Sequence, residues 1–224
     1  MAETISPQIR PAVPFAPDLS AQLDGEPAHL RFAFDQEDLP ELGGVFPGQA
    51  QLLIYPVQAY RDIYQGLDDN PVSQRIEALQ TLLEDQPETV DGAIPVLPGF
   101  GDAGQNLKAQ LKYLEFDGGS GLRFITHYGF DEAPITDHNT FYTFQGLTDD
   151  GQYYIAYYHP ASTDLLPSSF GEVTELIEDY DEFIENFDTY LEETAEQLDQ
   201  ADTGDFEPDL TNLDGMLETL RVQP

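Results

Sequence analysis

Apolar and polar side chains alternate along four consecutive segments in the middle of the chain, at 109–116, 122–128, 139–147 and 152–159. A period of two is typical of strands that turn one face to a core. The segments are rich in Tyr, Phe, Ile and Thr, and turn-forming residues or a loop separate them at 117–120, 129–138 and 148–151. The pattern therefore predicts a four-stranded antiparallel β-meander.

Two further strands and one helix are expected before the meander. Alternation begins near His29, continues through Phe34 and recurs at 51–55. Asn70 followed by Pro71 is a good helix start, because Asn caps the first turn and Pro needs no hydrogen-bond acceptor there. Apolar residues then repeat every three or four positions to about Glu84, which predicts an amphipathic helix.

The last third of the chain has the helical period. One apolar stripe runs from 173 to 198, and its members are Val173, Leu176, Ile177, Tyr180, Phe183, Ile184, Phe187, Tyr190, Leu191, Ala195 and Leu198. A shorter helix is expected at 210–220. These helices must bury their apolar sides, and the sheet is the natural partner. The fold class predicted is α+β, an antiparallel meander packed against C-terminal amphipathic helices.

The first residues differ from the rest in composition. Pro7, Pro11, Pro14 and Pro17 stand among small and polar residues, a spacing that favours extended, polyproline-like chain. We therefore expect a Pro-rich linker or tether at 1–26 and a single α+β domain at 27–224.

Charge excludes some classes of partner. The 224 residues carry 43 Asp and Glu against 8 Lys and Arg, a formal net charge of -35. Binding to nucleic acid needs clustered Lys and Arg, so nucleic acid is not an expected partner. No apolar run approaches the ~20 residues of a transmembrane helix. The acidity itself predicts solubility or tolerance of salt, with binding of divalent cations as the alternative.

A glycine-rich string, GFGDAG at 99–104, matches the spacing of a dinucleotide-binding loop. Such a loop follows a strand and opens a helix, whereas Pro95 and Pro98 interrupt the preceding segment and no strand-helix-strand unit surrounds it. We expect an ordinary loop here.

Three histidines and a carboxylate form a candidate metal site. A hairpin turn at Asp149 and Asp150 sets Thr140 opposite His159, and the 129–138 loop sets Thr140 near His127. The two histidines would then share one face of the sheet, two strands apart at about 9.6 Å. Asp137 and His138 would lie in the loop above them. Imidazole and carboxylate ligands suit zinc or another transition metal. The alternative is that these are hydrated histidines at a sheet edge, without a metal.

The aromatic side chains of the meander form a candidate ligand site. Tyr142, Phe144, Tyr153 and Tyr157 should point to one face, and Phe141, Tyr154 and Tyr158 to the other. Exposed aromatic platforms bind sugars or extended peptides. The first set is the candidate platform if the long helix covers the second, although we favour packing under a loop over ligand binding for the set that the helix leaves uncovered.

Several strings together resemble an uncharacterised family of bacterial extracytoplasmic lipoproteins. They are LLIYPVQAY, LKYLEFDGGSGLRFITHYG, NTFYTFQGLTDDGQYYIAYYHPAS and FEPDLTNLDGMLETL, within about residues 28–221. The resemblance implies an extracytoplasmic, secreted or lipid-anchored location. The chain departs from the family in showing neither an export signal nor a lipobox cysteine, so we expect that the leader is absent from this sequence.

These patterns lead to one main hypothesis and one alternative. The main one is a non-catalytic, monomeric binding domain without a cofactor. Its protein, peptide or carbohydrate partner would bind at the 129–138 loop or on the aromatic platform. The alternative is a metal-dependent hydrolase that uses His127, His138 and His159.

Overall fold

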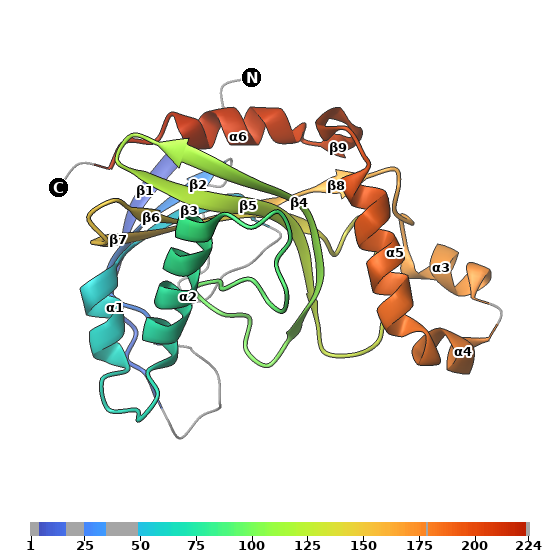
Figure 1. The fold of residues 1–224 in the computed structure, drawn as a ribbon, viewed down its shortest axis with the longest axis horizontal. Helices are drawn as coiled ribbons and strands as arrows, with labels where there is room; N and C mark the ends of the chain where they lie inside the picture. The colour runs from blue at the N-terminus through green and yellow to red at the C-terminus, as the bar shows by residue number, and fades with distance from the viewer. Residues whose placement is uncertain (1–4, 17–24, 35–48, 178, 223–224) are drawn as a thin grey trace.

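The computed structural model describes residues 5–16, 25–34, 49–177 and 179–222 (Figure 1). Its centre is a seven-stranded sheet with the order β1-β2-β3-β7-β6-β5-β4, in which every neighbouring pair is antiparallel. The strands are β1 (Ile5–Arg10), β2 (His29–Phe34), β3 (Gln51–Pro56), β4 (Gly104–Phe116), β5 (Gly119–Gly129), β6 (Phe141–Thr148) and β7 (Tyr153–Pro160). The predicted meander and the α+β class are confirmed.

Helices α1 (Val57–Ile63) and α2 (Pro71–Asp85) cover one face of the sheet, which we call the α2 face (Figure 1). The Asn70 side chain caps α2 as predicted, accepting hydrogen bonds from the backbone nitrogens of Val72 and Ser73. The apolar residues of α2 then pack on side chains of β3, β6 and β7. The core of this face includes Leu53, Tyr55, Ile76, Leu79, Phe141, Tyr154 and Tyr158.

The opposite face, the α6 face, packs against the end of the chain. Helices α5 (Phe187–Asp199) and α6 (Leu210–Glu218) lie on it, and a small sheet of β8 (Ser162–Thr163) and β9 (Phe206–Glu207) adjoins them (Figure 1). A 3₁₀ turn, η1 (Thr203–Asp205), precedes β9. The core of this face includes Leu52, Ile125, Tyr142, Phe144, Tyr157, Leu198, Leu210, Leu213 and Leu217. Helices thus cover both faces of the meander.

The apolar stripe at 173–198 does not form one helix, so that prediction is wrong. It divides into α3 (Phe170–Leu176), α4 (Tyr180–Glu185) and α5. The chain leaves the helical conformation at Ile177, and Asp179 starts a new helix by accepting hydrogen bonds from the backbone nitrogens of Asp181 and Glu182. An aspartate that caps a new helix competes with continuation of the previous one.

The N-terminal segment also differs from the expected linker. Ile5–Arg10 form β1, which pairs along its whole length with β2, from Ile5 opposite Phe34 to Arg10 opposite His29. Pro7 is tolerated because β1 is an edge strand, where a missing backbone donor costs little. Residues 17–24 of the expected tether lie outside the described residues.

The register of the β6–β7 hairpin differs from the predicted one by two residues. Tyr142 lies opposite His159, whereas the sequence suggested Thr140 in that place. The turn is centred on Asp150 and Gly151 because Gly151 adopts a left-handed conformation with φ of 67°. Thr148 and Asp150 hold it with a side-chain hydrogen bond of 2.7 Å.

None of the described helices combines the length and the apolarity of a membrane-crossing segment.

Candidate functional site

The expected aromatic platform lies in the core. Tyr142, Phe144 and Tyr157 are at most 1% exposed, and helices α5 and α6 pack over their face of the sheet. Tyr153, at the first position of β7, is half-buried. The second aromatic set is buried as well, beneath α1 and α2. These side chains stabilise the two cores and offer no open platform to a ligand.

The histidines do not come together as the metal hypothesis requires. His127 is buried beside Leu107, and burial lowers its pKa. His138 is 77% exposed, with its Nδ1 3.4 Å from Asp137 Oδ1. His159 Nδ1 lies 2.6 Å from its own neighbour, the Pro160 carbonyl oxygen. Among the described residues, no group of three His, Asp or Glu side chains is arranged to hold a metal ion.

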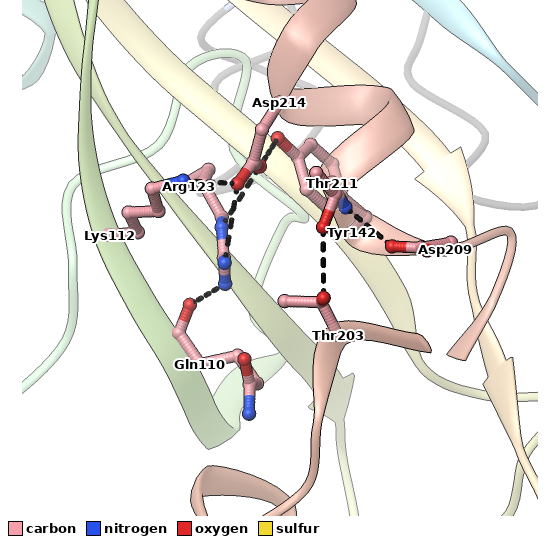
Figure 2. Close-up of polar contacts among 8 residues, drawn as sticks. All are labelled: Gln110, Lys112, Arg123, Tyr142, Thr203, Asp209, Thr211 and Asp214. Carbon is pink, nitrogen blue, oxygen red and sulfur yellow. Dashed lines mark hydrogen bonds and ion pairs between the residues drawn. The ribbon is translucent and has the colours of Figure 1, made fainter. Parts of the chain in front are cut away.

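The most elaborate polar arrangement of the described residues surrounds Asp214, on the buried side of α6 (Figure 2). Arg123 of β5 donates to both carboxylate oxygens, with Nε to Oδ1 at 3.1 Å and Nη2 to Oδ2 at 3.4 Å. Lys112 Nζ of β4 lies 2.9 Å from Oδ2. Tyr142 of β6 donates its hydroxyl to Oδ1 at 2.9 Å. One carboxylate thus joins α6 to three neighbouring strands.

A bulge in β4 extends this network to α5. The pairing of β4 with β5 shifts between Ala109 and Lys112, and Gln110 takes a left-handed conformation with φ of 58°. The Gln110 side-chain nitrogen donates to the carbonyl oxygens of Leu198 and Ala201, at the end of α5. Its own carbonyl oxygen accepts a hydrogen bond from Arg123 Nη1. Arg123 therefore couples the bulge to Asp214 (Figure 2).

Chemically, this cluster is suited to holding structure rather than to catalysis. Two cations and a hydroxyl already satisfy the Asp214 carboxylate, and Arg123 is itself 3% exposed. Burial raises the pKa of the Tyr142 hydroxyl, and the adjacent carboxylate raises it further, so Tyr142 stays a hydrogen-bond donor. A fully engaged carboxylate has no lone pair directed to a substrate.

The glycine-rich string forms the expected loop. Gly104 begins β4, so no helix follows the string, and Ala103 closes a turn by donating to the Phe100 carbonyl oxygen. The helix N-terminus that would bind a pyrophosphate is therefore missing at this place.

Two exposed aromatic side chains and one half-buried ring lie at the 129–138 loop and on α4. Phe130 is 74% exposed and Tyr180, which opens α4, is 48% exposed. The Tyr180 hydroxyl donates to the Glu132 carbonyl oxygen at 3.2 Å, which fixes α4 against the loop. The Phe183 ring lies 5.8 Å from that of Tyr180. We call Phe130, Tyr180 and Phe183 the aromatic rim.

The loop beneath the aromatic rim is firmly anchored. Ile135, which is fully buried, donates its backbone nitrogen to the Tyr190 hydroxyl of α5 at 2.9 Å. Asn139 Oδ1 accepts from the Thr136 backbone nitrogen at 2.9 Å and closes a small turn. Phe130 therefore extends into solvent from a loop whose centre, Pro134 to Thr136, is buried.

Carboxylates surround the aromatic rim. The exposed acids of the loop and of α4 are Asp131, Glu132, Asp179, Asp181, Glu182 and Glu185. The sequence has no Lys or Arg between Arg123 and Arg221. Exposed rings among acids present apolar area within a strongly negative field.

Sequence reasoning missed Asp214, Arg123 and Lys112. Two signals could have found them. Asp214 follows Leu213 on the apolar side of the last helix, where a carboxylate needs a partner. Arg123 stands between Leu122 and Phe124 in a strand of a chain with few cations. Comparison of the chain with protein-family models, curated proteins and solved structures finds no match.

Proposed function

We propose that the protein is a non-catalytic binding domain and that the aromatic rim receives a basic partner that carries apolar side chains. The observation that carries the proposal is the 74% exposure of Phe130 on a loop that hydrogen bonds anchor to Tyr180 of α4 and Tyr190 of α5. A large apolar side chain fixed in solvent has no role in the core, whereas aromatic anchors of this kind dominate the energy of protein interfaces.

Charge identifies the chemistry of the partner. The rings are surrounded by carboxylates, so an acidic partner would be repelled and a basic one attracted. Electrostatic attraction of this kind raises the association rate and weakens as salt is added. We therefore favour a Lys- or Arg-rich protein segment over a neutral sugar. An extracytoplasmic location, which the family resemblance implies, belongs to this proposal.

The experiment uses a synthetic peptide of alternating lysine and phenylalanine as the probe, titrated into the full chain by calorimetry. Binding should weaken with added KCl, and Phe130→Ser should reduce the affinity about tenfold, as expected when an aromatic anchor is lost. Leu67→Ser is the matched control, because Leu67 is also an exposed apolar side chain, at 40%, but lies after α1. Absence of binding, or equal losses in both variants, would reject the proposal.

A further inference from the structure

A cavity of about 420 Å³ lies between the two helices of the α2 face and the turn that joins β6 to β7. Helices α1 and α2 lie side by side at this place (Figure 1). The apolar wall of the cavity is formed by the half-buried Leu83 and by Val57, Ile76 and Leu147, none of which is more than 8% exposed. This volume, with an apolar wall and a few polar groups, is typical of pockets that hold a small ligand.

Arg61 of α1 brings a guanidinium group to the cavity. Its side chain is 32% exposed, and its Nη2 lies 4.0 Å from Glu77 Oε1, beyond hydrogen-bond distance. Its Nε is buried and has no hydrogen-bond partner among the described residues. Lys108, which lines another cavity, differs in this respect, because its ammonium group donates to the carbonyl oxygens of Val90 and Gly92. Arg61 therefore presents guanidinium surface that a ligand in the cavity can reach.

Three carboxylates line the same cavity. They belong to Glu84, near the end of α2, and to Asp149 and Asp150 of the β6–β7 turn, and all three residues are exposed. Within the described part of the chain, Arg61 forms its ion pair with Glu77 and with none of these three acids. The acids would repel a simple anion and Arg61 would repel a simple cation. A ligand that carries one charge of each sign on an apolar body matches the whole cavity.

We propose that this cavity binds a zwitterionic amino acid with an apolar side chain. Arg61 donates hydrogen bonds to the α-carboxylate, a group that guanidinium recognises well. Glu84 and Asp149 accept hydrogen bonds from the α-ammonium group, and Ile76 and Leu147 contact the apolar side chain. The site consists of α1, α2 and the β6–β7 turn, so it shares no element with the aromatic rim and is independent of the function proposed for the rim.

The test titrates L-leucine and L-phenylalanine into the full chain and follows binding by calorimetry and by thermal unfolding. At least one of them should raise the unfolding temperature, because a ligand that binds only the folded state stabilises it. The N-acetyl derivative of the amino acid that binds lacks the ammonium charge, and its amide lacks the carboxylate charge. Each derivative should bind about tenfold more weakly. Absence of binding at about 10 mM of both amino acids, well above a millimolar Kd, would overturn the proposal, as would equal binding of a derivative.

Variants test the two charged sides of the cavity separately. Arg61→Met should weaken binding about tenfold, and Arg61→Lys, which keeps the charge but loses the planar fork, should weaken it by less. The double variant Glu84→Gln, Asp149→Asn should weaken it through the ammonium group. Arg221→Met and Glu218→Gln are the matched controls, because both residues are exposed and lie outside the cavity, and they should bind as the wild type does. Unchanged binding in Arg61→Met or in the double variant would overturn the proposal.

Two further readouts separate a ligand site from a structural arginine. Without ligand, Arg61→Met should keep the wild-type urea midpoint, because its ion pair with Glu77 is long and exposed and contributes little. The same variant should bind the lysine–phenylalanine peptide as the wild type does, since other elements form the aromatic rim. A large fall in the urea midpoint of Arg61→Met would show that Arg61 serves the fold, and the proposal would fail.

Discussion

The Tyr142 hydroxyl donates a hydrogen bond of 2.9 Å to Asp214, a contact that connects the centre of the sheet to the last helix. Tyr142 belongs to the aromatic set that the sequence suggested as a ligand platform. Its hydroxyl instead completes the donor set of a carboxylate that also binds Arg123 and Lys112. The polar end of a core tyrosine is thus used to fix a helix to the sheet.

Removing the Asp214 carboxylate should destabilise the protein strongly. Asp214→Ala leaves Arg123 buried without its anion, and breaking a buried ion pair in this way costs about 3–5 kcal/mol. Urea unfolding would measure the change in the free energy of unfolding. Glu218→Gln, an exposed position on the same helix, is the control and should change it by less than about 0.5 kcal/mol. A loss for Asp214→Ala as small as the control would contradict the structural role of the cluster.

Two phenylalanines should respond oppositely to truncation. Phe144→Ala opens a cavity beneath α6 and should cost about 3–5 kcal/mol of stability. Phe130→Ala should leave stability almost unchanged, because the side chain is mostly in solvent. Thermal unfolding of the two variants would compare them. Equal losses would mean that Phe130 is part of the core and that the aromatic rim has been misplaced.

Salt should stabilise the protein. With a net charge of -35, repulsion between carboxylates opposes the compact state, and the Debye length falls from about 10 Å at 0.1 M to about 3 Å at 1 M. We expect the unfolding temperature to rise from low salt to molar KCl. An unfolding temperature that stays constant across that range would show that repulsion between the carboxylates does not destabilise the folded state.

Acid should destabilise the protein partly through His127. Burial lowers the pKa of His127 in the folded state, so the unfolded chain takes up this proton at a higher pH. The contribution of His127 to stability is therefore complete above its unfolded pKa, near pH 6.5, and is lost as the pH falls through the folded value.

The variant His127→Gln should consequently lose less stability than the wild type between about pH 7.5 and about pH 5.5. Urea midpoints of both proteins at the two pH values give the comparison. Identical pH dependence would exclude His127 as a contributor.

Local patterns predicted most of the elements because they depend on nearby residues. The alternation at 122–128 and the Asn70–Pro71 start each specify an element without reference to distant parts of the chain. One capping residue, Asp179, divides the 173–198 stripe into separate helices. The spacing of apolar residues carries no information about capping, so it did not predict this break. The hairpin register depended on Gly151 taking a left-handed conformation, and this shift moved His159 away from its expected partner.

The candidate sites were harder to predict, because both depend on contacts between distant segments. Asp214 and Arg123 are 91 residues apart in sequence, and the packing of α6 on the sheet brings them together. The cavity that Arg61 lines likewise lies between α1, α2 and the turn of a distant hairpin, and no local pattern indicates that these segments meet. Phe130 lay in a loop that was suggested as a binding rim, but its exposure is evident only from the structure.

Helices close both faces of the sheet, and we propose that partners bind at the aromatic rim. Amide NMR spectra recorded during titration with the lysine–phenylalanine peptide test this proposal most directly. We predict shifts at residues 129–138 and 180–187, with the central strands β6 and β7 unchanged. Shifts centred on Tyr142 and Tyr157 would contradict it, as would a spectrum that the peptide leaves unaltered.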